Sequence, residues 1–70
     1  MEVLVFKTNL TNTKKVFAVS LQLDVHPLIQ QWNVDLQDRD KVLRIEATGM
    51  EGKEVEAIIT AAGYRCQEFS

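Results

Sequence analysis

The spacing of hydrophobic and polar positions divides the first part of the chain into a strand and a helix. Residues 3–6, VLVF, are a β-branched and aromatic run that predicts a buried strand. In residues 16–23 apolar side chains recur at intervals of three and four, and Phe17 and Leu21 widen this apolar face, which predicts a helix. Pro27 disfavours helical geometry at the residue before it, so we expect the helix to stop there.

The pattern then changes to alternation, which is typical of strands with one buried face. Apolar and polar side chains alternate over residues 32–36 and again over residues 43–47. Residues 38–40, DRD, lie between these two segments and are suited to a turn. The two segments are therefore expected to pair as a hairpin.

A second helix and a short last strand complete the predicted fold. The apolar side chains of residues 55–62 fall on one helical face, and Gly63 stands where a helix uses glycine to close its last turn. Residues 64–69 are expected to form the last strand. The order β-α-β-β-α-β predicts an α+β, ferredoxin-like sandwich, in which two helices cover one face of a four-stranded antiparallel sheet. We expect one domain, residues 1–70.

Composition and charge exclude several classes of protein. With 46% hydrophobic and 26% charged residues, the chain has the composition of a globular domain. Residues 1–23 carry three lysines against one glutamate, whereas residues 24–70 carry five basic and nine acidic side chains. The pI of about 5.2 argues against binding of nucleic acid. The first residues contain no long apolar run, so we expect no signal peptide, no membrane span and a cytoplasmic protein.

The residue types needed for catalysis are scarce. The chain has one histidine and one cysteine, His26 and Cys66, and no serine, histidine and acid set at a suitable spacing, so we expect no enzyme. Residues 8–16, between the first strand and helix, contain neither the glycine nor the arginine of a loop that cradles phosphate. Residues 41–48 lack the aromatic side chains on which RNA bases would stack.

Four separated segments carry a resemblance to a known family. The stretch KTNLTNTKKV, residues 7–16, aligns without a gap with a K-T-N-I-N-C-G-G-C-V pattern. IQQWNVD (29–35), DKVL (40–43) and VEAIITAAGY (55–64) match further segments of the same proteins. The chain thus resembles the heavy-metal-associated domain family, which includes small copper chaperones and the N-terminal modules of copper-transporting ATPases. The resemblance implies the ferredoxin-like fold and a role in metal transport.

The resemblance breaks at the residues that bind metal in this family. The two metal-binding cysteines of the family fall on Asn12 and Lys15, and its intervening glycines on Thr13 and Lys14. Two thiolates at a helix start suit Cu(I), which is a soft ion. Asparagine offers only a hard carbonyl oxygen, and lysine an ammonium group that repels a cation. Tyr64, by contrast, matches the aromatic residue that lies near the metal loop in the family.

Other side chains could in principle replace the missing thiolates. Cys66 is the main alternative ligand for Cu(I) or Zn(II), and a symmetric dimer would bring two such thiols together. A lone cysteine more often behaves as a small hydrophobic side chain. His26 is interpreted as a helix-end residue and Met50 as a packing residue beside the second helix. We expect a monomer or a weak homodimer without a metal cofactor.

The loop before the first helix offers a different kind of site. Thr11, Asn12 and Thr13 are capping-type residues, and one of them should accept a hydrogen bond from an amide of the first turn. Lys14 and Lys15 place positive charge where the helix dipole disfavours it. Departures from local rules often occur at functional sites, although exposed lysines can also be simply solvated. We hypothesise a non-catalytic module in which these residues and Tyr64 contact an acidic protein partner or an anion.

Overall fold

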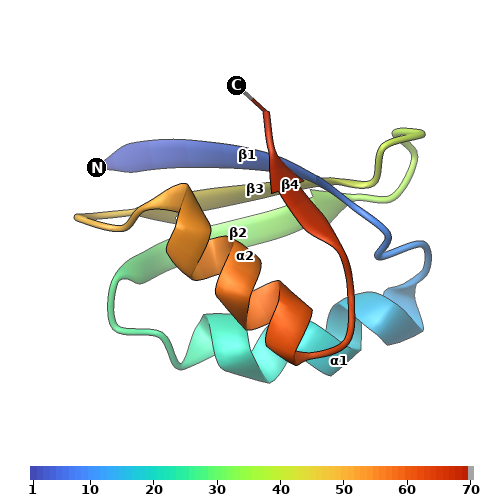
Figure 1. Cartoon of the computed structure of the whole chain (residues 1–70), viewed down its shortest axis with the longest axis horizontal. Helices are drawn as coiled ribbons and strands as arrows, with labels where there is room; N and C mark the ends of the chain where they lie inside the picture. The colour runs from blue at the N-terminus through green and yellow to red at the C-terminus, as the bar shows by residue number, and fades with distance from the viewer. Residues whose placement is uncertain (70) are drawn as a thin grey trace.

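The chain folds into a single antiparallel sheet with both helices on one of its faces (Figure 1). The structure is a computed structural model that describes residues 1–69; residue 70, the last of the predicted domain, lies outside the described residues. The strand order is β2-β3-β1-β4, so the predicted ferredoxin-like fold is confirmed. The elements are β1 (Glu2–Thr8), α1 (Thr13–Asp24), β2 (Ile29–Asp35), β3 (Val42–Ala47), α2 (Gly52–Ala61) and β4 (Cys66–Glu68).

Local sequence signals set the ends of both helices. Helix α1 stops three residues before Pro27, as predicted. Gly63 follows the end of α2 with a φ of 93°, a left-handed conformation that glycine adopts without a steric penalty. The amide of Gly63 donates to the carbonyl of Thr60 at 2.9 Å, and that of Tyr64 to the carbonyl of Ile59 at 3.1 Å. The chain then reaches β4, which is shorter than the predicted strand over residues 64–69.

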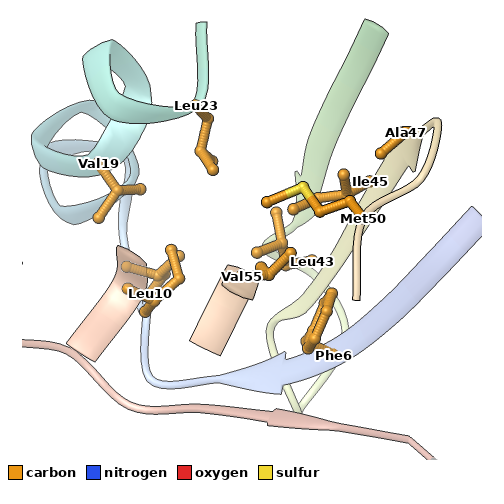
Figure 2. Packing of buried hydrophobic residues seen from close by; sticks show 10 residues of the cluster. Phe6, Leu10, Val19, Leu23, Leu43, Ile45, Ala47, Met50 and Val55 are labelled. Atoms are coloured by element: carbon orange, nitrogen blue, oxygen red, sulfur yellow. The ribbon is translucent and has the colours of Figure 1, made fainter. Parts of the chain in front are cut away.

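The core lies between the sheet and the two helices. Figure 2 shows its side chains converging from β1, β3, α1 and α2 into the space between these layers. Met50, just before α2, belongs to this core, which confirms its interpretation as a packing residue. Within residues 1–69, neither helix is long and apolar enough to cross a membrane. The core cluster comprises Phe6, Leu10, Val19, Leu23, Leu43, Ile45, Ala47, Met50, Val55 and Ile59.

The prediction that Phe17 and Leu21 extend the buried face of the first helix is wrong. Phe17 is 74% exposed and Leu21 is 66% exposed. Val19 and Leu23 are buried and Val16 packs beside them, and these three lie within about 60° of one another around the helix. Phe17 and Leu21 lie about 100–140° further round than Val16, beyond the stripe that a single sheet face can cover.

The prediction of a buried first strand is also wrong for one face of β1. Phe6 is completely buried, and Leu4 packs against the core. Val3 is 60% exposed, because alternate residues of β1 point to the sheet face that carries no helix. An apolar run alone does not reveal whether one or both faces of a strand are covered.

Candidate functional site

Three loops meet at the end of the sheet where β1 stops. The amide of Thr8 donates to the carbonyl of Asp40 at 3.0 Å, which joins β1 to the turn between β2 and β3. The amide of Asn9 donates to the carbonyl of Arg65 at 3.3 Å, and the Arg65 amide donates to Oδ1 of Asn9 at 2.7 Å. The loop between β1 and α1, which aligns with the metal loop of heavy-metal-associated domains, is therefore fixed against both neighbouring loops.

Asn12 caps the start of α1. Its Oδ1 accepts a hydrogen bond from the Lys15 amide at 2.9 Å, and its carbonyl accepts one from the Val16 amide at 3.1 Å. This is the geometry of a helix N-cap, which confirms that one of the three capping-type residues satisfies a free amide of the first turn. The side chain at the first family cysteine position thus stabilises the helix itself.

The remaining residues of this loop face solvent. Thr11, Thr13 and Lys14 are exposed, and Lys15 is half-buried. The first turn of α1 contains no acidic residue that could offset the two ammonium groups. We call residues 11–15 the cationic loop. The exposed ring of Phe17 follows directly on the same helix.

Tyr64 lies close to the loop, at the position that its family match indicates. It is half-buried and packs against the core cluster, which also contains Leu10 from the loop between β1 and α1. Its neighbour Arg65 forms both hydrogen bonds to Asn9. This places Tyr64 beside the loop, while its role as an interaction residue stays a prediction.

Cys66 lies at the same end of the sheet, where it pairs with Thr8 in the ladder between β1 and β4. The thiol is half-buried, and burial together with the charges of Glu56 and Glu68 raises its pKa from 9.0 to about 12. It therefore stays protonated at neutral pH. Among the described residues, no three His, Cys, Asp or Glu side chains are grouped so that they could hold a metal ion.

His26 is at the opposite end of the molecule. Its Nδ1 accepts a hydrogen bond from the Leu28 amide at 3.2 Å, in the connection between α1 and β2. Ile29, at the start of β2, pairs with Ala47 of β3, and Ala47 also pairs with Glu2 of β1. Since Cys66 pairs with the other end of β1, the structure does not bring His26 and Cys66 together.

We expect Cys66 to react slowly with iodoacetamide. Because its pKa is raised to about 12, little thiolate is present at about pH 8, and alkylation should be at least about tenfold slower in the native protein than in denaturant. The native rate should keep rising toward pH 12, whereas the rate in denaturant should level off near pH 9. Mass spectrometry of timed samples measures both rates, and equal rates in the two states would contradict the assigned environment.

A pocket beside the loop adds residues that the sequence did not single out. It has a volume of about 480 Å³ and is lined in part by Arg39 and Arg65, together with Lys7 from β1. Neither arginine was a candidate, because each follows a different element and nothing in the linear sequence shows that the two loops meet. None of the residues of the cationic loop lines this pocket.

The fold is that of copper chaperone and copper-transporter domains. The copper(I)-loaded first domain of the human copper chaperone for superoxide dismutase is 24% identical, with a TM-score of 0.79 over 94% of this chain and 89% of that one. The yeast copper transporter domain Ccc2a, solved in apo and Cu(I)-loaded states, is 11% identical, with a TM-score of 0.85 over 100% of this chain and 97% of that one. A chain of the Atx1-Cu(I)-Ccc2a complex matches with 11% identity and a TM-score of 0.84, over the same shares of the two chains.

These likenesses confirm the resemblance at the level of the fold. No protein-family model matches this chain, and no curated protein does. The chain combines the fold of these copper-handling domains with a single cysteine, which lies outside the loop between β1 and α1.

Proposed function

We propose that this domain is a non-catalytic protein-interaction module whose cationic loop docks onto an acidic surface of a partner protein. The observation that carries the proposal is the pair Lys14 and Lys15 in the first turn of α1, with no acidic residue in that turn and an exposed phenylalanine next to it. Positive charge at a helix N-terminus costs about 0.3–1 kcal/mol per residue. A carboxylate from a partner would offset this cost.

The surroundings of the cationic loop favour a protein over a small anion. The Lys15 amide already donates a hydrogen bond to the side chain of Asn12. Fewer free amides therefore remain at the helix start to bind an oxyanion. Phe17, 74% exposed on the adjacent turn, adds apolar aromatic surface of the kind that is enriched at protein interfaces. Among the fold neighbours, Atx1 and Ccc2a form a complex, which supports protein docking as a use of this fold.

Metal transfer is not part of the proposed function. Asn12 and Lys15 supply no soft ligand where the family has its two thiolates. The alternative, Cu(I) or Zn(II) bound through Cys66 alone or across a dimer, requires a thiol to lose its proton. Burial and two nearby glutamates oppose that loss. The proposal therefore assigns the domain no resident metal.

Charge reversal in the cationic loop should abolish partner binding. With the native protein as bait in an extract of its source cells, Lys14→Glu together with Lys15→Glu should reduce the amount of bound partner by at least about tenfold, because attraction becomes repulsion. Phe17→Ser should weaken binding as well. The matched control is Lys53→Glu, an exposed lysine near the start of α2, which should leave binding unchanged.

A synthetic acidic peptide tests the cationic loop without a cell extract. Adding a polyglutamate peptide to the labelled native protein should shift the amide NMR signals of residues 11–17, and added salt should reverse the shifts. The proposal is wrong if the double charge reversal leaves both partner capture and the peptide shifts as they are in the native protein.

A further inference from the structure

The pocket at the end of the sheet, which we call the end pocket, is separate from the cationic loop. Its volume of about 480 Å³ lies within the range of small-molecule sites in proteins. It is formed where the end of β1, the turn before β3 and the connection before β4 come together. Its polar and charged lining includes Lys7, Asn9, Arg39, Asp40, Arg65 and Gln67.

The end pocket concentrates positive charge in a chain with a net charge of −2. Three cations, Lys7, Arg39 and Arg65, line it, against the single carboxylate of Asp40. The charges of Glu56 and Glu68 raise the pKa of Cys66, which lines the pocket, but the two glutamates themselves do not line it. Within residues 1–69 the three cationic residues are exposed, and none of the side-chain hydrogen bonds of the structure comes from their side chains. Their donors are thus free for a ligand.

The backbone that carries these cations is held in place before any ligand arrives. Hydrogen bonds from Thr8 to Asp40 and between Asn9 and Arg65 tie the three segments together at 2.7–3.3 Å. The hydroxyl of Thr8 also donates to the carbonyl of Lys41 at 2.7 Å, which anchors the turn that carries Arg39. A site whose segments are already ordered loses less conformational entropy when a ligand binds.

We propose that the end pocket binds a small oxyanion with two or more negative charges, of the kind carried by phosphate esters and polycarboxylates. Lys7, Arg39 and Arg65 neutralise its charge, and the planar guanidinium groups donate paired hydrogen bonds to its oxygens. The amides of the Asn9 and Gln67 side chains provide further donors at the rim. The thiol of Cys66 is uncharged and does not repel the anion. This site is independent of the proposed function, which depends on other side chains.

Amide-resolved NMR titrations with pyrophosphate and with citrate test this site. Either probe should give saturable shifts at residues 7–9, 39–40 and 65–67, and Arg39→Gln or Arg65→Gln should each weaken binding by at least about tenfold. The matched control is Lys53→Gln, which removes an exposed cation of α2 that does not line the pocket and should change nothing. A response to pyrophosphate alone assigns a phosphate ligand, and a response to citrate alone assigns a polycarboxylate.

Failure of this site and failure of the proposed function give different results. The variant with Lys14→Glu and Lys15→Glu should keep the response to pyrophosphate or citrate while it loses partner binding. Three outcomes would overturn the end pocket as a site: no saturable shift with either probe, shifts centred on residues 13–15, or equal binding by the native protein and both arginine variants. Native signal dispersion in each variant confirms that the fold is intact.

Discussion

Replacement of Asn12 and Lys15 together by cysteine should give the protein a Cu(I) site. The two positions lie together at the start of α1, since Oδ1 of Asn12 reaches the amide of Lys15 at 2.9 Å. A thiolate at a helix N-terminus is stabilised by the dipole and, here, by the remaining charge of Lys14. Two such thiolates are soft ligands suited to Cu(I). The reduced variant should retain about one equivalent of Cu(I) through gel filtration, measured by atomic emission.

Matched variants show whether Cu(I) retention comes from the two thiolates or from other effects of the substitutions. Asn12→Cys alone should retain far less Cu(I), because the second thiolate is missing. Asn12→Ser with Lys15→Ser removes the same side chains and keeps a capping residue, so it should fold and bind no Cu(I). If the double-cysteine variant folds and retains no more Cu(I) than the native protein, this loop does not have the geometry of the metal loop in the copper-handling domains.

Ile45→Ala should remove much of the stability of the domain. Ile45 is completely buried on the central strand β3, where it pairs with Leu4 of β1 and Trp32 of β2. A buried isoleucine reduced to alanine costs about 2–5 kcal/mol. A chain of this length has a total free energy of unfolding of about 4–10 kcal/mol. Urea denaturation followed by circular dichroism should therefore show a large fall in the midpoint, or an unfolded protein at room temperature.

Two milder substitutions check that this loss comes from the core. Ile45→Val removes one methylene and should cost about 0.5–1.5 kcal/mol. Val3→Ala, on the uncovered face of the sheet, should cost less than about 1 kcal/mol, because Val3 is 60% exposed. Equal losses for Val3→Ala and Ile45→Ala would contradict the assignment of the core to the helix-covered face.

The order of the elements could be predicted because each boundary has a local cause. Pro27 stops α1 through its effect on the preceding backbone, and Gly63 ends α2 with a positive φ. Period-two alternation identified the hairpin of β2 and β3. The burial of Phe17 and Leu21 was predicted wrongly because the width of the covered stripe on α1 depends on how the helix sits on the sheet, which periodicity does not encode.

The two proposed sites differ in whether their residues could be recognised from the sequence alone. Asn12 as N-cap and the lysines after it are neighbours in the chain, so local rules were enough to single them out. Lys7, Arg39 and Arg65 are far apart in sequence and come together only through strand pairing and loop hydrogen bonds. Their proximity is a property of the sheet register, and it becomes visible only in three dimensions.

The likeness between this chain and the copper-handling domains is one of fold. Domains that are 11% and 24% identical to the chain have the same fold, and in this chain a loop joins β1 to α1. Within that loop, the chain has a capping asparagine and a lysine where two thiolates would be needed for Cu(I). The first turn of α1 instead carries Lys14 and Lys15, on which the proposed docking to an acidic partner rests.

A Cu(I) competition titration of the native, reduced protein shows whether the domain binds metal without the two cysteines. Cu(I) held by a chelator of known affinity is added stepwise, and transfer is followed by the amide NMR spectrum of the protein. We expect the chelator to keep the Cu(I) and the signals of residues 11–16 and of Cys66 not to move. Transfer of Cu(I) to the native chain, with shifts around Cys66 that disappear in Cys66→Ser, would show that the domain binds metal through a new ligand and would contradict the proposal that it has no resident metal.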